Sequence, residues 1–216
     1  MWKPDYVLFD CDGVLVDSET LTQILLSREL SRYGLNIAPD KMGEMFVGGT
    51  MAGVMQTAKD MGADLPDDWL DYIYATLFAE LAKQCEIIPG VHQMLDALDA
   101  AGVGFATCSN GPMSKMDVTL RRTGLWDRFE GRIFSAHDCA AAKPAPDVYL
   151  KAAVFAGVDP AQCAVVEDSA TGAKAGRAAG MRCFGYAAQT NPSKLTPICH
   201  EVFTDMLALP EVLRLA

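Results

Sequence analysis

The chain has 216 residues, 50% of them hydrophobic and 21% charged, which suits one globular domain or a core with a modest insert. Its formal net charge of −10 argues against a nucleic-acid-binding protein, which needs a basic surface. The first residues do not form a signal peptide, and no apolar stretch is long enough to span a membrane. We therefore expect a soluble, cytoplasmic protein with no nucleic-acid or membrane partner.

Seven cysteines are scattered along the chain, an odd number with no Cys-x-x-Cys pair. This pattern argues against a disulfide framework and against a structural zinc site. We expect reduced thiols, as is usual in cytosolic proteins. The sequence leaves the oligomeric state open, and we favour a monomer.

The first predicted element is a strand at residues 6–9, where four apolar residues follow one another. Such a run is typical of a parallel sheet, in which a strand is covered on both faces and loses its alternation. Asp10 then stands at the carboxyl end of the strand, where open α/β sheets bind ligands. Asp12 follows two residues later, so extended backbone would point both carboxylates the same way. The simpler alternative is an acidic loop whose Asp17 or Ser18 caps a helix.

Residues 17–86 show helical patterns and no strand pattern. Apolar residues recur at helical spacing over 19–33, and Gly34 is a good stop signal. Segments 42–62 and 69–82 predict two or three further helices. This stretch is therefore a helical insert after the first strand.

After residue 87, predicted strands alternate with predicted helices, which is typical of βαβ units and a parallel sheet. The predicted strands are 103–108, 132–135, 164–166, 182–186 and 201–203. The predicted helices are 91–101, 115–123, 146–156 and 170–179, followed by a final helix near the end of the chain. The fold class is thus α/β.

Polar side chains follow four strand ends in this scheme. They are Asp10 and Asp12, then Ser109 and Asn110, then Lys143, and then Glu167 and Asp168. Parallel strands all point one way, so their carboxyl ends converge on one crevice. Carboxylates bind Mg²⁺, a lysine supplies compact positive charge for phosphoryl oxygens, and a hydroxyl and loop amides donate to them. The constellation predicts a site for a magnesium-bound phosphate.

Each piece alone has a simpler explanation. Ser109 and Asn110 form a common turn sequence, and a lysine before proline, such as Lys143, is usually a solvated loop residue. Glu167 and Asp168 could stand at a helix N-terminus, which favours negative charge. Their order along the chain, each after a strand, favours a common site over four coincidences.

The same order resembles the four motifs of the haloacid dehalogenase-like superfamily, most of whose members are phosphatases. The segments FDCDGVLVDSE at 9–19 and VVEDSATGAKAG at 165–176 carry the resemblance, which covers the whole chain. They are similar to the branch of β-phosphoglucomutases and phosphoglycolate phosphatases. The SNGPxxKM pattern at 109–116 is similar to bacterial sugar-phosphate phosphatases of that branch. The resemblance implies a Rossmann-like core at 1–15 and 87–216, with an all-helical C1 cap inserted at 16–86.

The resemblance also implies a role for each site residue. Asp10 would be the nucleophile that forms an aspartyl-phosphate, and Asp12 the general acid and then the base for water. The phosphoryl group would be held by Ser109, Asn110 and Lys143. Mg²⁺ would be bound by Asp10, the Asp12 backbone carbonyl and Asp168, with Glu167 acting through water.

The implied function is Mg²⁺-dependent hydrolysis of a small phosphorylated metabolite, a sugar or organic-acid phosphate. A hexose-phosphate mutase is the first alternative, because β-phosphoglucomutases share these motifs. They carry a His twelve residues after the nucleophile and an Arg in the cap, where this chain has Thr22 and Met51. A non-catalytic, phosphate-binding member is the second alternative, but it would lack a nucleophile, acid or metal ligand, and none is lost here. Hydrolysis is therefore favoured.

Overall fold

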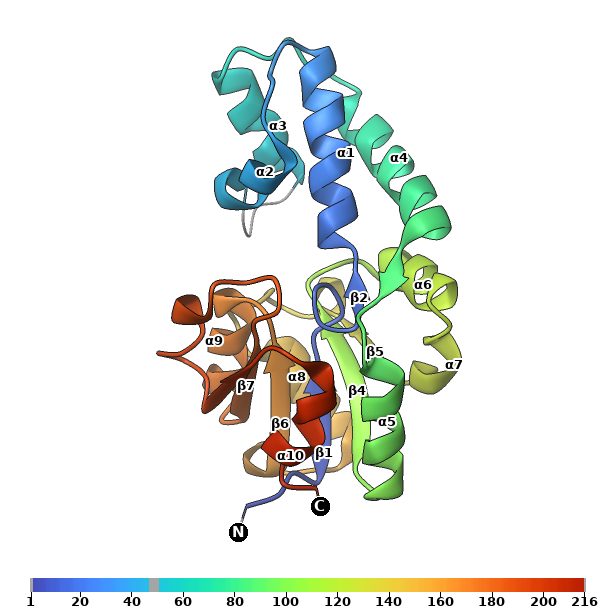
Figure 1. The fold of residues 1–216 in the computed structure, drawn as a ribbon, viewed down its shortest axis with the longest axis vertical. Coiled ribbons are helices and arrows are strands. Elements are labelled where there is room, and N and C mark those ends of the chain that lie inside the picture. Colours follow the sequence, from blue (N-terminus) through green and yellow to red (C-terminus); the bar gives the residue numbers. More distant parts are fainter. Residues whose placement is uncertain (1, 47–50, 216) are drawn as a thin grey trace. The chain divides into compact units, whose positions relative to one another are not determined.

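The structure is a computed structural model that describes residues 2–46 and 51–215 (Figure 1). It divides into two compact units. The first consists of Met1–Asp17 and Glu86–Ala216, and the second of Ser18–Cys85. The sequence predicts a core of residues 1–15 and 87–216 and a helical cap of residues 16–86.

Six strands form the main sheet of the first unit, in the order β5-β4-β1-β6-β7-β8 (Figure 1). They are β1 (Tyr6–Phe9), β4 (Gly104–Ser109), β5 (Ile133–Ser135), β6 (Cys163–Glu167), β7 (Arg182–Tyr186) and β8 (Glu201–Phe203). Every neighbouring pair in this sheet is parallel. The α/β fold class with a parallel sheet is therefore confirmed.

Both faces of the sheet are covered, which explains the apolar run of β1. Successive side chains along a strand point to opposite faces. On one face, Leu8 belongs to a buried cluster with Tyr149 of α8 (Asp147–Ala156) and Ala175 of α9 (Ala170–Ala178). Val7 and Phe9 point to the other face and are also fully buried. Every residue of β1 is thus in an apolar environment, and no alternation remains.

The other helices of the first unit are short. They are α5 (Val91–Ala100), α6 (Met113–Arg122), α7 (Trp126–Phe129) and α10 (Leu209–Val212), with 3-10 turns at Ala136–Asp138, Pro160–Gln162, Pro192–Lys194 and Met206–Ala208. The sequence did not predict α7, which is a single turn. Its Phe129 is fixed by long-range packing, with its ring 5.2 Å from that of Phe105 in β4.

The second unit contains α1 (Glu19–Arg32), α2 (Pro39–Phe46), α3 (Met51–Asp60) and α4 (Trp69–Gln84). α1 packs against α2 and α4, and α3 packs against α4. The buried residues of α4 recur every four positions and so form one apolar stripe: Trp69, Ile73, Leu77 and Leu81. The buried carboxylate of Glu29 accepts hydrogen bonds from Arg32 at 2.8 Å and from the Tyr72 hydroxyl at 3.3 Å.

A second, two-stranded sheet corrects the purely helical description of the insert at its two ends. β2 (Val16–Asp17) and β3 (Glu86–Ile87) pair in antiparallel register, Val16 with Ile87 and Asp17 with Glu86. Strands of two residues are too short to show alternation, so no sequence pattern marks them. Both belong to the first unit, and their pairing brings the start and the end of the insertion together.

All seven cysteines are free thiols, as the sequence predicts. Five of them are buried, and burial raises the pKa of Cys163 and Cys183 to about 11 and about 12. Among the helices of residues 2–46 and 51–215, none combines the length and the hydrophobicity needed to cross a membrane.

Candidate active site

The predicted polar residues meet at the carboxyl edge of the three central strands. Asp10 directly follows β1, Ser109 ends β4, and Glu167 ends β6. β4 and β6 flank β1 on its two sides. The Asp10 N–H donates to the carbonyl oxygen of Val166 at 2.9 Å and so continues the β1–β6 ladder past the end of β1. The backbone thereby fixes Asp10 between the two other strand ends.

Lys143 links these strand ends through its ammonium group. Its Nζ donates to Asp10 Oδ1 at 2.6 Å, to Glu167 Oε1 at 2.6 Å and to the Cys108 carbonyl oxygen at 2.8 Å. An ammonium has three donors, so all are used. The side chain is only 3% exposed. Burial acts to lower the pKa of Lys143, but the charges of Asp10 and Glu167 outweigh it and raise that pKa, so the group stays protonated.

Asn110 fixes the backbone that carries Lys143. The Asn110 carboxamide accepts from the Lys143 N–H at 2.9 Å and donates to the Lys143 carbonyl oxygen at 3.3 Å. This two-point contact joins the loop after β4 to the loop that bears the lysine. The side chain of Asn110, expected to contact phosphate, is therefore engaged with the peptide groups of Lys143.

Three carboxylates form a cluster around the same point. One oxygen each from Asp10, Glu167 and Asp168 lies within 4.8 Å of the other two. All three residues are buried. The Asp12 carboxylate contacts Lys115 and Ser109 instead. The cluster supplies hard oxygen donors of the kind that Mg²⁺ prefers.

The charges at this edge are unbalanced. Burial raises the pKa of Asp10 to about 8, the charge of Lys143 opposes the rise, and the charges of Glu167 and Asp12 add to it. Four carboxylates share the edge with two ammonium groups: Asp10, Asp12, Glu167 and Asp168 with Lys115 and Lys143. When all four carboxylates are ionised, the excess of two negative charges matches a divalent cation.

Asp12 is held by two partners from the segment after β4. Lys115 Nζ donates to Asp12 Oδ1 at 2.7 Å, and Ser109 Oγ donates to Asp12 Oδ2 at 3.3 Å. Ser109 Oγ in turn accepts from the Gly111 N–H at 2.8 Å. Burial acts to lower the pKa of Lys115, but the charge of Asp12 and the hydrogen bond to it leave that pKa raised. Lys115 therefore stays protonated beside Asp12.

Two glycines allow the backbone to approach these carboxylates. Gly13 has φ +78°, and a Cβ at this position would overlap the Asp168 carboxylate. Gly172, in the first turn of α9, has the same relation to the Glu167 carboxylate. Any side chain at either position would displace a member of the carboxylate cluster.

Sequence reasoning gave no role to Tyr149, or to Lys115, although Lys115 stands in the SNGPxxKM pattern. The Tyr149 hydroxyl donates to Glu167 Oε1 at 2.7 Å, and its ring lies 4.7 Å from Lys143 Nζ. Tyr149 is one of the buried residues of α8, so in the sequence it looks like an ordinary core residue. Lys115 did leave a signal, because it stands in the first turn of α6, where the helix dipole disfavours a cation.

Comparisons with known proteins show the family to which the chain belongs. Residues 4–180 match the haloacid dehalogenase-like hydrolase family. The 6-phosphogluconate phosphatase of Escherichia coli K12 is 29% identical over 217 residues, which cover 98% of this chain and 96% of that protein.

Two solved structures superpose over nearly the whole length, each with a TM-score of 0.87. One is a conserved haloacid dehalogenase-like protein, ATU0790, from Agrobacterium tumefaciens, 34% identical with 97% of each chain covered. The other is a HAD family hydrolase from Deinococcus radiodurans with bound phosphate and sodium, 31% identical with 100% of this chain and 97% of that one covered. The resemblance inferred from the motifs is confirmed, as is the enzyme class: the chain belongs to the haloacid dehalogenase-like hydrolase family, alongside its phosphatases.

Proposed function

We propose that this chain is a Mg²⁺-dependent phosphatase that hydrolyses a small phosphomonoester through a phosphorylated Asp10. The contact that carries the proposal is the buried Lys143 ammonium, which bridges Asp10 and Glu167 at 2.6 Å each. It puts a fixed positive charge beside a carboxylate at a strand end. Phosphoryl transfer depends on such positioning and charge neutralisation.

The residues fit a bound Mg²⁺ ion. In this proposal, Asp10, Asp168 and the backbone carbonyl of Asp12 hold the ion, and Glu167 contacts it through water. The donor set supports this assignment, because three buried carboxylates lie together and carry more negative charge than the lysines offset. When bound, the ion neutralises phosphoryl oxygens and keeps Asp10 ionised beside an anionic substrate.

The chain's own residues then account for both chemical steps. Asp10 attacks phosphorus while the bond to the leaving oxygen breaks, and Asp12 gives that oxygen a proton. In the second step Asp12 takes a proton from water, which attacks the aspartyl-phosphate and releases phosphate and free Asp10. Ser109 donates to a phosphoryl oxygen, and Lys143, whose three N–H groups are taken by protein oxygens, stabilises the phosphoryl charge from beside Asp10. Asn110 contributes by its backbone amide and by fixing the Lys143 peptide.

The substrate we propose is a sugar or organic-acid phosphate of the cytoplasm, handled by a monomeric enzyme. The E. coli relative is named for 6-phosphogluconate, which is both a sugar phosphate and an organic acid. We further propose that the helical unit Ser18–Cys85 is the C1 cap that selects among such substrates. 6-Phosphogluconate is therefore the first compound to test.

The test is a panel of phosphorylated sugars and organic acids, including 6-phosphogluconate, with released phosphate as the readout. Each compound is assayed with Mg²⁺, with a chelator, and with a parallel Asp10→Asn preparation that excludes contaminating phosphatase. We expect release that requires both Mg²⁺ and Asp10. Release that persists equally in the chelator or in Asp10→Asn would refute the proposal.

A mutase would need its aspartyl-phosphate to outlast the reorientation of a bound sugar bisphosphate. This chain has Thr22 and Met51 where such enzymes carry His and Arg, and Thr22 Oγ1 donates locally to the Ser18 carbonyl at 2.7 Å. The discriminating assay supplies β-glucose 1-phosphate with catalytic glucose 1,6-bisphosphate. We expect phosphate to appear faster than glucose 6-phosphate, and the reverse order would favour a mutase.

A further inference from the structure

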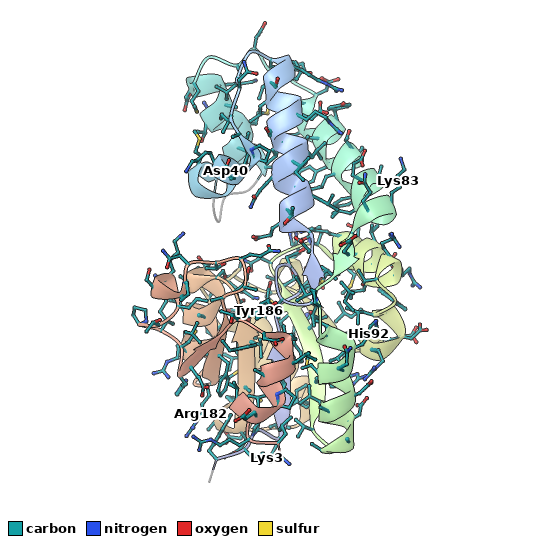
Figure 2. All side chains as sticks on the ribbon, viewed as in Figure 1. Lys3, Asp40, Lys83, His92, Arg182 and Tyr186 are labelled. Atoms are coloured by element: carbon teal, nitrogen blue, oxygen red, sulfur yellow. The ribbon has the colours of Figure 1, made fainter. Side chains whose placement is uncertain are left out.

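A cavity of about 440 Å³ lies at the amino edge of the sheet, at the opposite ends of the strands from the catalytic residues. Arg182 begins β7, His200 directly precedes β8, and Arg177 lies in the last turn of α9. Figure 2 labels Arg182 and Tyr186, which mark the amino and carboxyl ends of β7. The cavity is thus separate from the site around Asp10.

The cavity is lined by two guanidinium groups and an imidazole, without matching acids. Arg177, Arg182 and His200 face it, and none of the lining residues that the structure describes is Asp or Glu. The Arg182 guanidinium lies over the Trp2 ring, 4.3 Å from its centroid. This contact uses the face of the guanidinium, so its in-plane N–H groups can still donate hydrogen bonds to a ligand. Within residues 2–46 and 51–215, these N–H groups of Arg182 have no acceptor.

Two N–H groups approach the His200 ring, one from Cys183 and one from Arg177, but a neutral imidazole has only one nitrogen that can accept. The Cys183 N–H donates to His200 Nδ1 at 3.2 Å, and Arg177 Nη1 lies 2.9 Å from His200 Nε2. Burial and then the charges of Arg177 and Arg182 lower the pKa of His200, so its ring is neutral and carries one proton. If Nε2 carries it, that N–H faces Arg177, and if Nδ1 carries it, that N–H faces Cys183. An added acceptor beside Arg177 and His200 relieves the conflict.

An aromatic stack holds this group of donors in place. The Trp2 ring stacks on Phe184 with centroids 6.1 Å apart, and Phe184 stacks on His200 at 6.3 Å. The Trp2 indole N–H donates to the Ala161 carbonyl oxygen at 3.1 Å. The backbone N–H of His200 donates to the Cys183 carbonyl oxygen at 2.7 Å. The donors are therefore positioned before any ligand binds, which lowers the entropic cost of binding.

We propose that this cavity binds a small phosphate-bearing anion through Arg177, Arg182 and the His200 Nε2–H. A guanidinium matches the geometry of a phosphate with two parallel hydrogen bonds. The volume lies in the range of small-molecule sites, roughly 300–1,000 Å³, and exceeds what one phosphate group fills. The ligand class is therefore a diphosphate or a phosphorylated metabolite, bound independently of the catalytic carboxylates.

The test uses the whole chain with a carboxyl-terminal tag, because Trp2 lines the cavity. Pyrophosphate is the probe, titrated in chelator while backbone amide NMR signals are followed. We expect saturable shifts at Gly180, Met181, Arg182 and Cys183. Shifts confined to residues 10–13, 109–111 and 167–168 would assign the binding to the catalytic edge and overturn the proposal.

A charge-matched pair of variants gives a second measurement. Arg177→Gln/Arg182→Gln removes the two guanidiniums, and Arg121→Gln/Lys151→Gln removes two exposed cations elsewhere on the same unit. Calorimetry should show pyrophosphate binding weakened about tenfold or more in the first variant and unchanged in the second. Equal weakening in both variants would mean that binding depends only on net charge, which would overturn the proposal. No weakening in Arg177→Gln/Arg182→Gln would also refute the site. Phosphate release by the first variant should match the unmodified chain, so this test is separate from that of the proposed catalysis.

Discussion

The Lys115 ammonium donates to Asp12 Oδ1 at 2.7 Å, and the two side chains are each only 18% exposed. The lysine comes from α6, 103 positions along the chain from the aspartate. A mostly buried pair is costly to break, because the remaining charge loses its partner without regaining full hydration. The orientation of the proposed acid–base residue therefore depends on a lysine that the SNGPxxKM pattern contains but to which sequence reasoning assigned no role.

We predict that Lys115→Met lowers kcat by about 10- to 100-fold with little change in KM, because Asp12 loses the group that orients it. Lys115→Arg, which keeps the charge, should recover part of the loss. Steady-state kinetics on the best substrate of the panel measures both. Arg121→Gln is the control, since its pair with Asp117 is exposed and contributes little. Equal kcat in Lys115→Met and Arg121→Gln would show that the buried pair has no catalytic role.

Asp10→Asn should reduce turnover by about 10⁴-fold or more, since it removes the nucleophile while keeping its volume. The melting temperature should stay close to that of the unmodified chain or rise, because the substitution keeps the side-chain volume and removes a carboxylate whose ionised form burial disfavours. Mass spectrometry after rapid acid quenching should detect a phosphoryl adduct on the unmodified chain alone. An adduct of equal yield in Asp10→Asn would place the covalent step on another residue.

Asp12 and Asp168 should respond differently to Mg²⁺. Asp168→Ala removes a proposed ligand and should raise the Mg²⁺ concentration for half-maximal activity about tenfold or more. Asp12→Ala should cut kcat but leave that midpoint nearly unchanged, because only the Asp12 backbone carbonyl is asked to bind the metal. Mg²⁺ titrations of the activity of both variants measure the two midpoints. A larger midpoint shift in Asp12→Ala than in Asp168→Ala would contradict the assignment.

The Mg²⁺ midpoint should also depend on pH. Burial raises the pKa of Asp10 to about 8, so below that pH a proton occupies the carboxylate that the metal needs. Raising the pH removes this competitor, and apparent Mg²⁺ affinity should increase from about pH 6 to about pH 8, by at most about tenfold per pH unit for one displaced proton. Calorimetric Mg²⁺ titrations at several pH values measure the slope. A midpoint that does not move over this range would mean that Asp10 is already ionised in the metal-free protein.

Much of the fold followed from the sequence because its strands are short, largely apolar and bounded by turns. The predicted strands 182–186 and 201–203 have the bounds of β7 and β8. The polar residues of the four junctions also converge as predicted, because the direction of parallel strands leaves them no other edge. The order of the strands did not follow from the sequence, since neighbours such as β1 and β6 pair across more than 150 residues.

The unpredicted parts share a physical cause, which is that they depend on contacts distant in sequence. β2 and β3 exist only because each pairs with the other. Tyr149 has the same apolar surroundings in the sequence as its core neighbours, and only the fold brings its hydroxyl to Glu167. Asn110 was assigned to phosphate because it follows the predicted strand 103–108 and matches a family motif. The contact of its side chain with the Lys143 peptide depends on the path of a loop 33 residues away.

The antiparallel pairing of β2 and β3 makes the helical unit an exchangeable module. Val16 and Ile87 are paired neighbours, so the two connections between the first unit and the 68 residues of Ser18–Cys85 lie side by side. A two-residue hairpin turn can span adjacent antiparallel strands. Inserts of different lengths can therefore be joined to β2 and β3 without changing the register of the main sheet. If this unit selects the substrate as proposed, exchanging it would change substrate choice while leaving the catalytic edge as it is.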